Sequence, residues 1–158
     1  MLPDIFQLIK KLDSLDYVVE EELATILLLM LKLKKPLLLE GPPGVGKTEA
    51  SQIIASYLNT KLIRLQCYEG LDVNSAVYEW NYQKQLLSIK LTESSALSSA
   101  EKESHIFGDE FLLKRPLLQA ITESDKAPVL LIDEIDRADE EFEAFLLELL
   151  SAYQISIP

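Results

Sequence analysis

The sequence has few cysteines and no long apolar run. Cys67 is the one cysteine, so the chain can form no internal disulfide and has no CxxC pattern for a metal or redox centre. The longest unbroken apolar run, residues 26–31, is far short of the ~20 residues that a membrane-spanning helix needs. The amino terminus also lacks the pattern of a secretion signal. We therefore expect a protein of a reducing compartment, the cytoplasm.

Positive charge is also scarce. The chain has 15 Lys and Arg against 26 Asp and Glu, a formal net charge of −11. Affinity for nucleic acid comes mainly from Lys and Arg that displace counterions, so we expect no nucleic-acid partner, and no membrane partner either. A chain of 158 residues with ordinary globular composition is expected to form one domain around a core.

Apolar runs alternate with amphipathic segments along the chain. Three runs predict buried strands: residues 37–39, 62–65 and 129–132. Residues 19–34 predict a helix with an acidic first turn and a basic last turn, which Pro36 stops. Residues 48–58 predict an amphipathic helix that ends at Asn59. Strand, loop, helix and strand in this order form the unit of a mainly parallel sheet, so the predicted fold class is α/β.

Four further segments are assigned from local signals. Residues 73–80 predict a helix, and residues 92–104, rich in Ser, Ala and Glu, predict a mobile surface loop. Pro116 predicts the start of a short helix. Asp139, followed by acidic residues and an apolar stripe, predicts the start of the last helix.

One Gly-rich segment matches a complete phosphate-binding pattern. Residues 41–48 read GPPGVGKT, which fits G-x-x-x-x-G-K-[ST], between an apolar run and a predicted helix. Glycines allow the backbone N–H groups of such a loop to turn toward a β-phosphate at the positive end of the helix. The predicted binding residues are Gly41, Pro42, Gly44, Val45, Gly46, Lys47, Thr48 and Glu49. Lys47 would reach the β- and γ-oxygens and Thr48 would ligate Mg²⁺, the alternative being a turn that only links strand to helix.

A second pattern favours a phosphate site over a turn that only links strand to helix. The run VLLIDE places Asp133 and Glu134 at the end of an apolar strand, as expected of the strand beside a phosphate loop. Asp133 is predicted to hold Mg²⁺ and Glu134 to activate the water that attacks the γ-phosphate. A solvated acidic strand end is the alternative for both, and Asp136 and Arg137 fit a functional role and a surface role equally well.

The segments GPPGVGKT and LLIDEIDRA, with an acidic Leu-rich helix after them, resemble AAA+ ATPases and are most similar to the MoxR branch. The stretches LIRLQCYEGLDVNSAVYEW and FLLKRPLLQAI are similar to ATPases encoded with carbon monoxide dehydrogenase type molybdenum enzymes. The resemblance implies a three-layer α/β/α P-loop NTPase that binds ATP and Mg²⁺ and hydrolyses ATP. It also implies a homo-oligomer, often a hexamer, that remodels or matures a client protein such as a metalloenzyme.

The resemblance carries two more expectations about particular residues. It places Tyr17, Val18 and Val19 where such ATPases cover adenine, with core packing as the alternative for each valine. It makes residues 1–158 the N-terminal part of a C-terminally truncated AAA+ domain, because sensor 1, the arginine finger and the helical lid would follow Pro158. The resemblance also implies that the strand expected after Pro158 lies between the strand before the phosphate loop and the strand that ends at Asp133. The segment alone is then expected to be a poor or inactive ATPase. The family commonly has Asn where this chain has Asp136.

The same residues support other functions less well. A small-molecule kinase must keep a water-activating carboxylate away from the γ-phosphate, and Glu134 argues against that role. A GTPase would need an N-K-x-D motif, which does not occur in the chain. A nucleotide-binding module without efficient hydrolysis stays open. Cys67 follows a predicted strand and is expected to be a small core residue.

Overall fold

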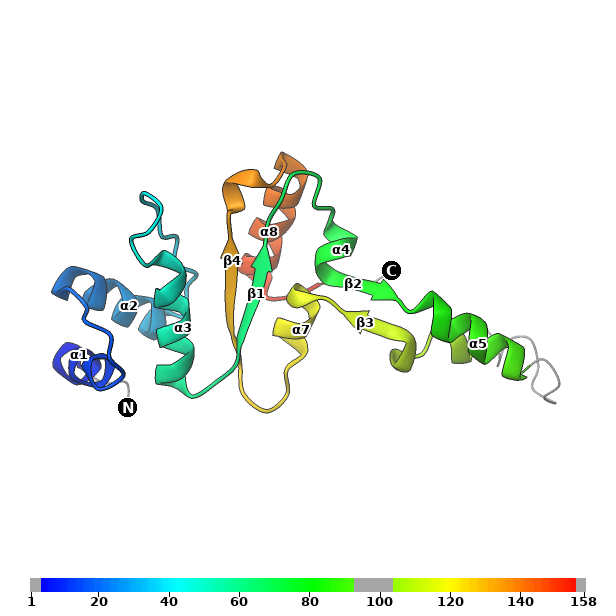
Figure 1. The fold of residues 1–158 in the computed structure, drawn as a ribbon, viewed down its shortest axis with the longest axis horizontal. Helices are drawn as coiled ribbons and strands as arrows, with labels where there is room; N and C mark the ends of the chain where they lie inside the picture. The colour runs from blue at the N-terminus through cyan, green and yellow to red at the C-terminus, as the bar shows by residue number, and fades with distance from the viewer. Residues whose placement is uncertain (1–3, 93–103, 156–158) are drawn as a thin grey trace.

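The computed structural model describes residues 4–92 and 104–155 (Figure 1). Seven helices, four strands and two short 3₁₀ turns lie wholly within these ranges, and residues 104–106 are also helical. The helices are α1 (Ile5–Asp13), α2 (Glu21–Leu33), α3 (Lys47–Leu58), α4 (Val73–Val77), α5 (Tyr82–Thr92), α7 (Pro116–Thr122) and α8 (Glu140–Ala152). The strands are β1 (Leu62–Gln66), β2 (Tyr78–Trp80), β3 (Leu112–Lys114) and β4 (Val129–Asp133). The 3₁₀ turns are η1 (Asp109–Phe111) and η2 (Ile135–Arg137). No helix in these two ranges is long and apolar enough to cross a membrane.

The central pairing joins β1 and β4 in parallel. Leu62 lies opposite Val129 at one end of the ladder, and Gln66 lies opposite Asp133 at the other. Because the strands are parallel, both carboxyl ends reach the same edge of the sheet. The predicted strands at residues 62–65 and 129–132 are therefore confirmed, and so is the α/β class with a parallel sheet.

Helices pack on both faces of this pair (Figure 1). One apolar cluster joins α1, α2 and α3: Leu8, Leu12, Leu27, Leu28, Ile53 and Ile54. The other joins β1, α4, α7 and α8 and includes Leu65, Cys67, Leu117, Phe142 and Leu146. Successive residues of β4 alternate between them, since Val129 packs on the first cluster whereas Leu130 and Ile132 pack on the second. The sheet is thus the middle of three layers.

The predicted strand at residues 37–39 is wrong in this structure. Those residues form no ladder, and the side chain of Leu38 is 68 % exposed. Within the described residues β4 pairs only with β1, and every residue of β4 is partly exposed rather than buried. A strand is defined by its pairing, and segment 37–39 has no neighbour here that could supply it.

Most of the predicted helix boundaries are confirmed. Lys34 closes α2 in the left-handed conformation before Pro36, and Asn59 does the same for α3. Pro116 opens α7. Asp139 caps α8, because its carboxylate accepts the backbone N–H of Phe142 at 2.9 Å.

The region after β1 differs from the prediction. The helix predicted over residues 73–80 ends at Val77, and Tyr78–Trp80 form β2, which pairs antiparallel with β3. The pairing partner lies some 35 residues further along the chain, so local propensity did not reveal it. Figure 1 shows this pair of strands and α5 projecting away from the central sheet. Of the loop predicted over residues 92–104, residues 93–103 lie outside the described part.

The cap of α8 makes a testable contribution to stability. Asp139→Ala should lower the free energy of unfolding by about 1 kcal/mol, because it removes a cap acceptor and a negative charge from the positive end of the helix. Asp139→Asn keeps the acceptor and should retain most of the stability. Urea denaturation followed by circular dichroism measures both variants. An alanine variant as stable as the parent would show that the cap contributes nothing.

Candidate functional site

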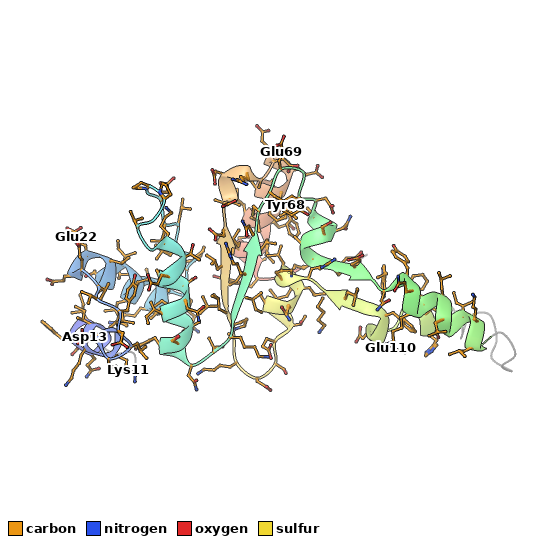
Figure 2. The ribbon with its side chains drawn as sticks, in the orientation of Figure 1. Lys11, Asp13, Glu22, Tyr68, Glu69 and Glu110 are labelled. Carbon is orange, nitrogen blue, oxygen red and sulfur yellow. The ribbon has the colours of Figure 1, made fainter. Side chains whose placement is uncertain are left out.

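The elements that carry the predicted phosphate-binding and carboxylate residues meet at one edge of the central sheet (Figure 1). The loop at residues 41–46 enters α3 at the end where the carboxyl ends of β1 and β4 lie (Figure 1). Figure 2 shows Tyr68 and Glu69 on the segment that leaves β1 at this end. Ligands of open α/β sheets bind at the carboxyl ends of the strands, so this end is where a ligand is expected.

The loop has the backbone conformation that its glycines permit. Gly44 and Gly46 have φ of 85° and 83°, in the left-handed region that residues with a side chain rarely adopt. A Cβ on Gly44 would meet nothing within 4 Å, so backbone conformation rather than crowding requires glycine there. Gly46 is also the N-cap of α3. The predicted loop residues thus run directly into the helix whose first turn holds Lys47, Thr48 and Glu49.

Lys47 folds back across the loop. Its Nζ donates to the carbonyl oxygens of Gly41 and Pro42, both at 2.7 Å. These two acceptors hold the ammonium group beside the backbone of the loop. An ammonium in this place can exchange carbonyl oxygens for phosphate oxygens without a change in backbone.

Asp133 connects the strand pair with α3. The hydroxyl of Thr48 lies 3.5 Å from Asp133 Oδ2, at the long end of the hydrogen-bond range. Arg64 of β1 donates to the same oxygen, from Nη2 at 2.7 Å and from Nε at 3.2 Å. The hydroxyl and the carboxylate predicted to hold Mg²⁺ are therefore neighbours, although they lie far apart in the sequence. Oxygen ligands of this kind suit Mg²⁺.

Glu134 has a strained backbone and an unsatisfied oxygen. Its φ of 55° is left-handed, which is uncommon for a residue other than glycine and clusters at functional sites. Its Oε2 is buried without a hydrogen bond, even though Arg137 Nε lies 3.1 Å away. The arginine is close enough for an ion pair but is not aligned for a hydrogen bond. Glu134 follows the last residue of β4 and so lies at the carboxyl end of the strand pair, next in sequence to Asp133.

Of the residues predicted to cover adenine, Tyr17 lies near the first turn of α3. Burial raises the pKa of the Tyr17 phenol, and the charge of Glu49 raises it further, which places this ring close to α3. Val18 is 89 % exposed, whereas Val19 packs on the cluster of α1, α2 and α3. Tyr17, Val18 and Val19 line an open cavity of about 310 Å³ with residues of α1.

That cavity includes none of the phosphate-loop residues. The candidate phosphate site is the loop, because it leads into the N-terminus of α3, where backbone N–H groups can bind phosphate. The cavity lies against α1, and its mainly apolar lining can receive an apolar ring.

The sequence assigns no role to Arg64, and it leaves a functional role and a surface role equally open for Arg137. Arg64 interrupts an apolar strand and contacts Asp133 across the sheet, whereas Arg137 contacts Glu134, three residues before it, a spacing that is visible in the sequence. The available signal for Arg64 was a charge inside the run LIRLQ. Its partner depends on the register of β1 with β4, which the sequence alone does not fix.

A family model for the AAA domain of the dynein-related subfamily matches residues 36–158. The chain belongs to this family. The match begins just before the phosphate loop and includes both carboxylates and α8. It establishes the AAA+ ATPase relationship and the P-loop NTPase fold of this AAA domain. Searches of curated proteins and of solved structures found no match.

The expected core position of Cys67 is confirmed, since its side chain is 0 % exposed. Burial raises the pKa of the Cys67 thiol, and the charges of Asp133, Asp136 and Glu134 raise it further. Because the thiolate is the reactive form, iodoacetamide should alkylate Cys67 at pH 8 at least about tenfold more slowly in the folded AAA domain than in urea. Mass spectrometry after timed quenching measures both rates. Equal rates would mean that the thiol is accessible and ionises normally.

Proposed function

We propose that this AAA domain binds ATP with Mg²⁺ and hydrolyses the bond between the β- and γ-phosphates. The observation that carries the proposal is the approach of Thr48 to Asp133 at 3.5 Å, with Glu134 as the next residue. The hydroxyl in the first turn of α3 and the carboxylate at the end of β4 are thus neighbours, and they are the pair proposed to hold the metal. Family membership supports ATP use in general.

Each residue has a distinct role in the proposal. The backbone N–H groups of the loop and Lys47 bind the phosphates, and Thr48 and Asp133 hold the metal. When bound, Mg²⁺ neutralises charge on the β- and γ-oxygens. Glu134 orients a water and accepts its proton as the water oxygen attacks the γ-phosphorus and the bond to the bridging oxygen of ADP breaks. Tyr17, Val18 and Val19 provide the surface for adenine.

The wider role follows from the resemblance to the MoxR branch. We infer a homo-oligomer in the cytoplasm that uses ATP to remodel or mature a client protein such as a metalloenzyme. The support is the pair of stretches similar to ATPases encoded with molybdenum enzymes. Affinity capture from the native host with Glu134→Gln, which should hold ATP without turnover, is the experiment that would identify a client.

Binding and turnover should separate in two substitutions. Lys47→Ala should weaken ATP binding by about 10–100-fold, because a charge-assisted hydrogen bond to phosphate is lost. Glu134→Gln should bind ATP like the parent and lower phosphate release by about a hundredfold or more, because the proton acceptor is lost. Calorimetry measures affinity, and single-turnover release of phosphate measures hydrolysis.

A matched control for Lys47 lies at the other end of the same helix. Lys126 donates to the carbonyl oxygens of Leu58 and Asn59, so Lys126→Ala removes an equal charge without touching the loop. Its ATP affinity should equal that of the parent. Identical affinity of Lys47→Ala and the parent would place the nucleotide elsewhere, and parental phosphate release by Glu134→Gln would remove Glu134 from the reaction.

We also propose that a further parallel strand completes the sheet between β4 and segment 37–39. Two observations support it: one edge of β4 has no partner among the described residues, and segment 37–39 carries an exposed leucine and no ladder. An added strand would satisfy the backbone groups of both edges, each of which costs about 1–3 kcal/mol if buried and unpaired. The resemblance supplies the same order of strands.

Completion of the sheet predicts a gain in stability. A protein extended beyond Pro158 through the remainder of an AAA domain should melt at a higher temperature than residues 1–158 and release phosphate faster. An arginine finger is typically worth ~10³–10⁵ in rate, so the kinetic gain should be large if the extension supplies one. Scanning calorimetry and phosphate release compare the two proteins. Equal melting temperatures and equal turnover would refute the added strand.

A further inference from the structure

Arg64 reaches the metal-binding carboxylate from a neighbouring strand. It lies in β1 between Ile63 and Leu65, which are buried, while its own side chain is 48 % exposed on the opposite face. Its backbone lies opposite Leu131, two residues before Asp133. The guanidinium therefore extends along the sheet toward the carboxyl ends of the strands, where the phosphate loop lies.

The contact is directed at a single oxygen. Nε at 3.2 Å and Nη2 at 2.7 Å both donate to Asp133 Oδ2, rather than one to each carboxylate oxygen. The hydroxyl of Thr48 approaches this same oxygen at 3.5 Å. A metal ion held between Thr48 and Asp133 would thus lie against the oxygen that already accepts from a cation.

A purely structural role accounts poorly for this arrangement. Ion pairs with solvent-exposed partners contribute little to stability, and the side chain of Arg64 is half exposed. Its side chain lies outside the apolar clusters that hold β1 in the fold. The consequence of a positive charge beside Asp133 is instead electrostatic, because two cations that share one carboxylate oxygen repel each other.

We propose that Arg64 is a positioning residue of the metal site, which competes with Mg²⁺ for Asp133 Oδ2 and lowers the affinity of the domain for the metal alone. The inference rests on the proposed function, since it assumes that Asp133 binds the metal. The phosphates of a nucleotide bring negative charge that offsets the guanidinium. Arg64 thereby favours entry of the metal together with the nucleotide over entry of the metal first.

Mn²⁺ titration in the absence of nucleotide tests the sign of the effect. Free Mn²⁺ measured by electron paramagnetic resonance gives the dissociation constant for the parent and for Arg64→Ala, which should bind Mn²⁺ about fivefold more tightly. Arg64→Lys keeps the charge and should stay closer to the parent. In an Asp133→Asn background, Arg64→Ala should have no effect, a dependence that a general change in stability would not produce.

Lys61 provides the matched control. It precedes β1 at the far end from Asp133 and pairs with Glu123 at 2.9 Å, so Lys61→Ala removes the same charge from the same segment. Its Mn²⁺ affinity should equal that of the parent. Thermal melting of every variant shows whether the comparison is made on folded protein.

Unchanged or weaker Mn²⁺ binding by Arg64→Ala would overturn the inference, because the metal would then use Asp133 without competing with the guanidinium. The proposed function has a separate test. If Asp133→Asn leaves Mg²⁺-dependent ATP binding unchanged, the assignment of Asp133 as a metal ligand fails. If it abolishes that binding while Arg64→Ala has no effect on Mn²⁺, only the role of Arg64 fails.

Discussion

The parallel pairing of β1 with β4 is the constraint on which the site depends. Its register sets Gln66 opposite Asp133 and puts Arg64 within reach of the same carboxylate. A shift of one residue would move every side chain of β4 to the opposite face and carry Asp133 away from Thr48. The register is specified by burial, since Leu65 and Ile132 pack into one apolar cluster while Val129 packs into the other.

The second constraint is the packing of α3 on that pair. Ile53 and Ile54 hold α3 in the cluster with α1 and α2, and this cluster also contacts Val129 at the start of β4. Contacts far from the phosphate loop thus set the distance between Thr48 and Asp133. Packed interiors resist small displacements. The apolar contacts of α3 therefore affect the proposed reaction by fixing where Thr48 lies relative to Asp133.

The sequence predicted the parts of the structure whose signals are local. The phosphate loop, the caps at Asn59 and Asp139, and the apolar strand before Asp133 each depend on neighbours within a few residues, and the structure contains all of them. The antiparallel pairing of β2 with β3 depends on residues distant along the chain. The same holds for any pairing of segment 37–39. Patterns of three residues do not identify such partners, which is why a helix was extended too far and a strand was assigned where no ladder forms.

Two arginines place positive charge beside the two carboxylates of the site. Asp133 and Glu134 are adjacent and would repel each other and the phosphates of ATP if no cation were close. Arg64 contacts the first at 2.7 Å and Arg137 the second at 3.1 Å, each from a different element. The two contacts differ in kind, because Arg64 makes aligned hydrogen bonds whereas Arg137 leaves Glu134 Oε2 without one. The carboxylate proposed to hold the metal is therefore fixed in direction by two hydrogen bonds, whereas Glu134 has an ion-pair partner on Oε2 but no aligned donor there.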